Sequence, residues 1–70
     1  MNRYHLEIIP GNQTPFDRII EADDMVNNSD GFYRFIKRVE ENNSTVHYQT
    51  IAYYPISRTI ITKIEYKIEP

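Results

Sequence analysis

The chain has 70 residues, which suffice for one small domain but leave no room for a second hydrophobic core. Eight lysine and arginine residues against ten aspartate and glutamate residues leave a formal charge of −2, so the chain lacks the positive field of a nucleic-acid-binding tail. Apolar residues make up 40% of the chain, and the eleven isoleucines and nine phenylalanine or tyrosine residues exclude a low-complexity disordered protein. The absence of cysteine excludes a disulfide scaffold and a cysteine-ligated zinc module.

The first ten residues mix charged with apolar side chains and show no signal-peptide core. No run reaches the roughly 18 apolar residues that a membrane-spanning helix needs. We therefore expect a cytoplasmic protein without a membrane segment. A domain this short buries only about 60% of its unfolded surface, so dense β packing, a partner or a second copy must supply stability.

Alternation of apolar and polar residues predicts the first strand. Tyr4, Leu6 and Ile8 are separated by polar residues, which indicates a strand at 3–9 that ends at a proline-glycine turn.

The next part of the chain fits two descriptions. A Thr-Pro start and the spacing of apolar residues are compatible with short helices near 15–26 and 30–41, which would give an α+β fold. The turn-forming run 27–31 ends in Asp-Gly, and aromatic strand formers follow it as in a hairpin. We prefer strands at 16–22 and 31–39.

Two further strands are predicted at 45–54 and 58–68. Alternation in the first places one set of side chains on a single face: Val46, Tyr48, Thr50, Ala52 and Tyr54. Alternation in the strand at 58–68 places charged residues on one face and a second set of side chains on the other: Ile60, Thr62, Ile64, Tyr66 and Ile68.

Together these segments predict an all-β domain over residues 1–70. Short polar turns between consecutive strands favour an antiparallel meander. Five short strands with one apolar face would curl into a small barrel or a strongly bent sheet.

Four short patterns occur in order along the chain: an acidic-Ala-Asp strand end at 21–24, a Gly-aromatic return strand at 30–35, an aromatic-Pro bend at 52–55 and an Ile-rich strand at 60–65. This order resembles small, mostly uncharacterised β proteins that bacteriophages and other mobile elements encode. The resemblance implies a phage-like accessory protein that binds a host factor in the host cytoplasm. It brings no catalytic residue with it.

Candidate metal and catalytic groups are few. Four acidic residues, Glu21, Asp23, Asp24 and Asp30, lack the spacing of a calcium loop, and we interpret them as solvated turn residues. The two histidines, His5 and His47, could meet on adjacent strands, but surface positions are the simpler interpretation.

We expect no metal ion and no cofactor. No nucleophile, base and oxyanion donor can be combined from these residues, so the sequence predicts that the protein is not an enzyme.

Tyrosine is enriched, with six residues in 70. Rigid rings with a polar tip, together with arginine, are typical of protein interfaces, although the same rings could wall a thin barrel. We therefore predict a non-enzymatic protein-binding module, which as a phage effector would bind and inhibit a host protein. The expected anchors are Tyr33, Arg34, Tyr53 and Tyr54.

Three further expectations concern partners. A single-stranded nucleic-acid-binding barrel would use Phe32, Arg34, Lys37 and Arg38, but an acidic residue precedes Gly31 where RNA-binding strands carry a basic one. A structural subunit of a virion or of a larger assembly is another alternative function. An Ile-rich edge strand at 58–68 could also pair with a second copy to form a homodimer.

Overall fold

The computed structural model describes residues 1–27, 29–42 and 45–68. The elements in chain order are β1 Asn2–Ile8, β2 Phe16–Ala22, β3 Asp24–Asn27, β4 Phe32–Glu41, β5 Thr45–Pro55, the 3-10 turn η1 Ile56–Arg58, and β6 Thr59–Glu65. The protein is therefore nearly all-β, as predicted. The helical alternative for 15–26 and 30–41 is wrong, because β2, β3 and β4 cover these regions.

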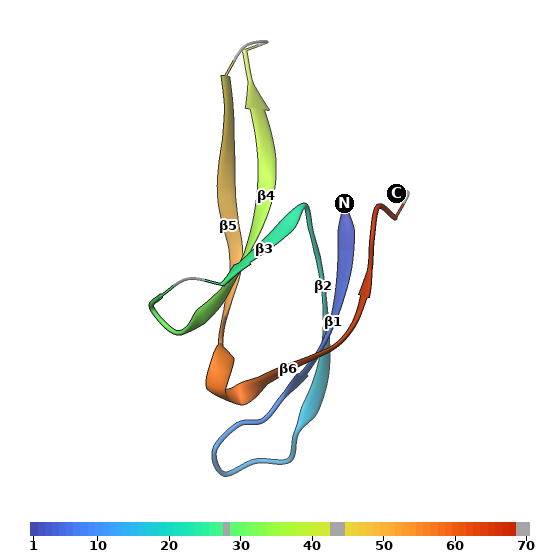
Figure 1. Ribbon diagram of the computed structural model, residues 1–70, viewed down its shortest axis with the longest axis vertical. Coiled ribbons are helices and arrows are strands. Elements are labelled where there is room, and N and C mark those ends of the chain that lie inside the picture. Colours follow the sequence, from blue (N-terminus) through green and yellow to red (C-terminus); the bar gives the residue numbers. More distant parts are fainter. Residues whose placement is uncertain (28, 43–44, 69–70) are drawn as a thin grey trace.

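The strands form two three-stranded antiparallel sheets (Figure 1). Sheet A has the order β2-β1-β6 and sheet B the order β3-β4-β5. Of the predicted meander, the antiparallel pairs β1-β2 and β4-β5 are confirmed, whereas β2 and β4 lie in different sheets and β6 returns to pair with β1 instead of β5. The described ladders do not close on themselves, so the predicted five-stranded barrel is not confirmed.

Asp23 is the corner at which the chain leaves sheet A and enters sheet B. Its backbone N–H donates to the carbonyl of Ile36 at 2.9 Å, and its carboxylate accepts from the backbone N–H of Arg38 at 2.6 Å. The sequence pattern does not predict the strand β3 that follows, because its four residues are too few to show an alternation.

Replacing Asp23 by alanine is expected to lower the free energy of unfolding by about 1–2 kcal/mol, because a charge-assisted hydrogen bond to the Arg38 amide is lost. Urea denaturation followed by circular dichroism measures this loss. Asp23→Asn keeps an oxygen acceptor and serves as the control. If the alanine variant is as stable as the unmodified protein, the hydrogen bond between the Arg38 amide and the Asp23 carboxylate does not stabilise the fold.

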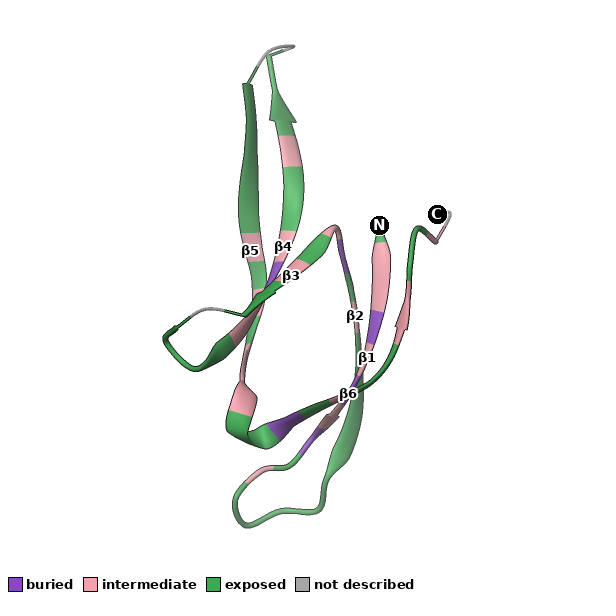
Figure 2. Cartoon of the chain, viewed as in Figure 1, coloured by how far each residue is buried: buried purple, intermediate pink, exposed green. Residues whose placement is uncertain are grey.

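The core lies between the inner faces of the two sheets. Three alternating residues of β1, namely Tyr4, Leu6 and Ile8, are buried, as the sequence predicts. The ring of Phe35 from β4 packs edge-on against Tyr4, with 5.1 Å between centroids. Figure 2 shows the buried positions on β1, at the end of β2, in β4 and at the start of β6, whereas the distal part of the β4–β5 hairpin is mostly exposed.

Two register shifts correct the predicted faces of the last two strands. In β5 the shift lies opposite Phe35 and Ile36 and leaves Ile51 without a partner in the ladder. In β6 the shift lies opposite His5 and Leu6 and does the same for Thr62. An unpaired extra residue moves the alternation by one position, so neither strand keeps one set of side chains on a single face.

The correction sorts these residues as follows. Ala52 and Tyr54 pair with inward-facing residues of β4, whereas Thr50, Tyr48 and Val46 pair with Ile36, Arg38 and Glu40 on the opposite face. In β6, Ile61 and Ile64 both pack on the core although they are three positions apart, and Ile60 is exposed.

The β4–β5 hairpin extends well past β3 and forms a projecting arm (Figure 1). The last residue of β4 that β3 pairs with is Ile36, whereas the β4–β5 ladder continues to Glu41 and Thr45. Within the described part of the chain, no helix has the length and apolar character needed to cross a membrane.

Candidate functional site

The outer face of sheet B carries a cluster of aromatic and basic side chains. Phe32 and Arg34 alternate along β4, and Tyr53 lies opposite Arg34 on β5. The guanidinium carbon of Arg34 is 5.2 Å from the centroid of the Tyr53 ring, and the rings of Phe32 and Tyr53 meet edge-to-face at 6.0 Å. Val26 of β3 pairs with Arg34 from the other side. We call Val26, Phe32, Arg34 and Tyr53 the Arg34 face.

Arg34 is held in place without a counter-charge. Its Nε atom is buried and has no hydrogen-bond partner, and no ion pair joins its guanidinium to another described residue. The guanidinium lies over the Tyr53 ring, whose face attracts its positive charge. Because Nε is buried, an external acceptor would have to reach this guanidinium through its terminal Nη donors.

The structure divides the four predicted partner anchors between two faces. Arg34 and Tyr53 lie together on the Arg34 face, as described above. Tyr33 and Tyr54 are paired on the inner face and pack against the core, with the Tyr54 and Phe35 rings 6.1 Å apart. Those two tyrosines support the fold at this position and do not join the outer cluster.

The predicted nucleic-acid-binding set is also divided. Phe32, Arg34 and Arg38 lie on one face of β4, but Lys37 points to the other face, where it pairs with Gln49. The guanidinium of Arg38 lies 3.8 Å from the carboxylate of Glu40, so its charge is partly offset.

The acidic residues that we considered for a cation site have separate roles. Each accepts its own hydrogen bond: Glu21 from the side chain of Arg3, Asp23 from the Arg38 amide, Asp24 from the Met25 amide, and Asp30 from the Phe32 amide. The described residues contain no group of three or more potential metal ligands.

The two histidines are not on adjacent strands. His5 lies in β1 between β2 and β6, and His47 lies in the arm opposite Val39.

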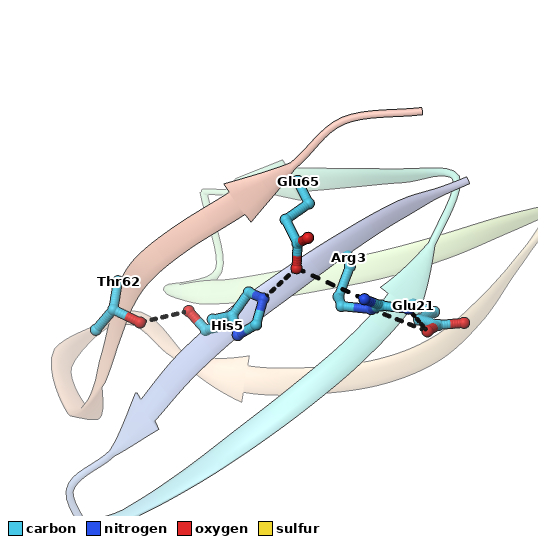
Figure 3. A network of polar contacts seen from close by, with 5 residues as sticks. All are labelled: Arg3, His5, Glu21, Thr62 and Glu65. Carbon is cyan, nitrogen blue, oxygen red and sulfur yellow. Dashed lines mark hydrogen bonds and ion pairs between the residues drawn. The ribbon is translucent and has the colours of Figure 1, made fainter. Parts of the chain in front are cut away.

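The outer face of sheet A carries a polar network that the sequence did not reveal (Figure 3). Arg3 donates to Glu21 through Nε at 3.1 Å and Nη2 at 3.0 Å, and its Nη1 lies 3.7 Å from Glu65. The ring nitrogen Nε2 of His5 is 2.6 Å from the same oxygen of Glu65. The hydroxyl of Thr62 donates to the backbone carbonyl of His5 at 3.2 Å. These contacts join all three strands of sheet A.

We expect the Glu65 contacts to make stability depend on pH. The hydrogen bond from His5 lowers the pKa of Glu65 from its ordinary value of 4.5, and Lys63 and Arg3 add to this effect. A carboxylate with a lowered pKa in the folded state stabilises the fold above pH 4.5, and this contribution is lost as the pH falls through the folded-state pKa. The urea midpoint should therefore fall less steeply in Glu65→Gln than in the unmodified protein between pH 5 and pH 3.

Glu7→Gln is the control for this measurement, because Glu7 lies on the same face of β1 and accepts no hydrogen bond from a described side chain. Its pH profile should follow that of the unmodified protein. Identical profiles for Glu65→Gln and the unmodified protein would show that the contact with His5 does not contribute.

Comparison of the chain with protein-family models, with curated protein sequences and with solved structures finds no match.

Proposed function

We propose that the protein is a non-enzymatic protein-binding module that binds a partner protein through the Arg34 face, with a single carboxylate of the partner at Arg34. The observation that carries this proposal is the guanidinium of Arg34, which lies over Tyr53 and has no counter-charge among the described residues. Arginine and aromatic residues are the types that contribute most to the affinity of protein interfaces. A carboxylate of the partner would accept two hydrogen bonds from the guanidinium, and Phe32 and Val26 would contact apolar groups beside it.

Several features favour a protein over single-stranded nucleic acid as the partner. Asp24 pairs with Ile36 and therefore borders the Arg34 face, and Glu40 lies on the same face beside Arg38. Lys37 faces away, as described above. A surface with alternating charges on a chain of net charge −2 attracts phosphates weakly. The resemblance to phage proteins suggests that the partner is a protein of the bacterial host. Binding would then inhibit that host protein.

Capture from a bacterial lysate tests this function. The tagged protein, its Arg34→Ala variant and its Lys37→Ala variant would each be incubated with nuclease-treated and untreated lysate. The two variants form a matched pair, because both remove a cation from β4 but on opposite faces. We expect one protein, with or without nuclease, in the unmodified and Lys37→Ala samples. Arg34→Ala should weaken its binding at least about tenfold.

Two results would contradict the proposal. Capture that disappears with nuclease, or that falls equally in both variants, would indicate binding through nucleic acid. Capture that Arg34→Ala leaves unchanged would show that the Arg34 face is not the binding surface.

A further inference from the structure

Four of the described strands lie at the edge of a sheet, and one of them, β5, has no Asp, Glu, Lys or Arg. Sheet A ends at β2 and β6, and sheet B ends at β3 and β5. β2 contains Asp17, Arg18 and Glu21, β3 begins with an aspartate, and β6 contains lysine and glutamate. The eleven residues of β5 include no Asp, Glu, Lys or Arg. Charged residues on an edge strand oppose pairing with another chain, so β5 is the edge that is open to it.

Exposed apolar side chains are concentrated on the same strand. Val46 is 42% exposed and Tyr48 is 61% exposed, and Ile51 and Tyr53 are also exposed. No other described strand carries as many exposed large apolar side chains. The first two lie in the projecting arm, where β4 is the neighbour of β5 and β3 has already ended. A hairpin of two strands is marginally stable in water, and a third strand stabilises it.

We propose that residues 45–49 of β5 pair antiparallel with the same residues of a second copy of this chain. A two-fold axis at His47 places Val46 of each copy opposite Tyr48 of the other. The dimer therefore contains two such pairs, and in each pair one exposed apolar side chain covers the other. The two sheets B then form one continuous six-stranded sheet. The ladder before the register shift at Ile51 is regular, which leaves this segment straight enough to pair.

The residues near the axis allow a second copy as the pairing strand. Two-fold pairing sets a segment against itself, so a fixed charge near the axis would oppose its own copy; this segment has no Asp, Glu, Lys or Arg, and the ring of His47 lies 3.9 Å from Glu41 of its own arm. On the adjacent strand β4, Arg38 pairs with Tyr48 and Glu40 pairs with Val46. In the dimer, Arg38 of one arm and Glu40 of the other lie at the same level but are separated by the two β5 strands, and Arg38 already lies 3.8 Å from Glu40 of its own arm, so the apolar pairs and not these charges hold the copies together. The sequence-based expectation of pairing through 58–68 would instead bring Lys63 and Glu65 to the contact.

Sedimentation equilibrium over a range of concentrations tests the pairing. The unmodified protein should approach twice the chain mass of 8.4 kDa. Tyr48→Lys adds a charge beside the axis and should raise the dimer dissociation constant at least about tenfold. Ile19→Lys, which makes the same kind of change at an exposed site on β2, should leave this constant unchanged. A single-chain mass for the unmodified protein at every concentration would overturn the proposal, as would equal weakening by the two variants.

Single cysteines provide a second readout that does not depend on the folding of Tyr48→Lys. The natural chain has no cysteine, so each introduced thiol can form a disulfide only with its own copy. His47→Cys places the two thiols at the axis and should give a disulfide-linked dimer on mild oxidation. Ile60→Cys on β6 should give at most a small fraction of linked chains. If Ile60→Cys forms the disulfide-linked dimer and His47→Cys does not, the β5 pairing is overturned and the copies pair through β6.

Discussion

Replacing Phe35 by alanine is expected to lower the free energy of unfolding by about 3–5 kcal/mol. Its side chain is fully buried and packs against Tyr4 from sheet A and Tyr54 from sheet B. The substitution therefore leaves a cavity at the contact between the sheets. Because a small domain is stabilised by only about 0.05–0.15 kcal/mol per residue, this loss is comparable to the whole stability of the molecule.

Urea denaturation followed by far-ultraviolet circular dichroism measures this effect. Phe32→Ala is the matched control, because it removes the same ring from the same strand on the outer face, where Phe32 is 39% exposed. The control should stay within about 1 kcal/mol of the unmodified protein. Similar losses in the two variants would contradict the assignment of the inner and outer faces of β4.

Replacing Leu6 by alanine is expected to cost about 3 kcal/mol, with a range of roughly 2–5 kcal/mol for buried leucines. Leu6 is 1% exposed and lies in the central strand of sheet A, opposite Ile61 of β6. The loss of folding stability should appear as a lower urea midpoint. The molecules that remain folded should capture the partner as well as the unmodified protein does. Because Leu6→Met nearly preserves volume, it should cost less than about 1.5 kcal/mol. An alanine variant as stable as the methionine variant would show that the site is not tightly packed.

The sequence predicts those parts of the fold that depend on local alternation. Tyr4, Leu6 and Ile8 alternate without interruption, and the strand and its buried face follow directly. The two register shifts, at Ile51 and Thr62, depend on which strands pair and at what offset, and neither is visible within one strand. Five short strands are compatible with a barrel, and the change of sheet at Asp23 that prevents this simple closure has no local signal.

The sequence predicts only part of the candidate site, because it shows the alternation within a strand but not the register between strands. That Phe32 and Arg34 share a face follows from their spacing within β4. The position of Tyr53 opposite Arg34 requires the register of β4 with β5. Alternation separates the two faces of β4 and β5 without showing which one the other sheet covers, so the sequence alone does not place Tyr33 and Tyr54 on the core side. The network on sheet A joins residues 18 and 60 positions apart, Arg3 with Glu21 and His5 with Glu65, and only the folded chain brings them together.

Mapping the partner by nuclear magnetic resonance tests the central claim most directly. The captured partner would be added to isotope-labelled protein, and changes in backbone amide signals would be followed. Binding through the Arg34 face predicts the largest changes at Phe32, Arg34 and Tyr53, and their loss in Arg34→Ala. Changes confined to sheet A, around Arg3 and Glu65, would contradict the account.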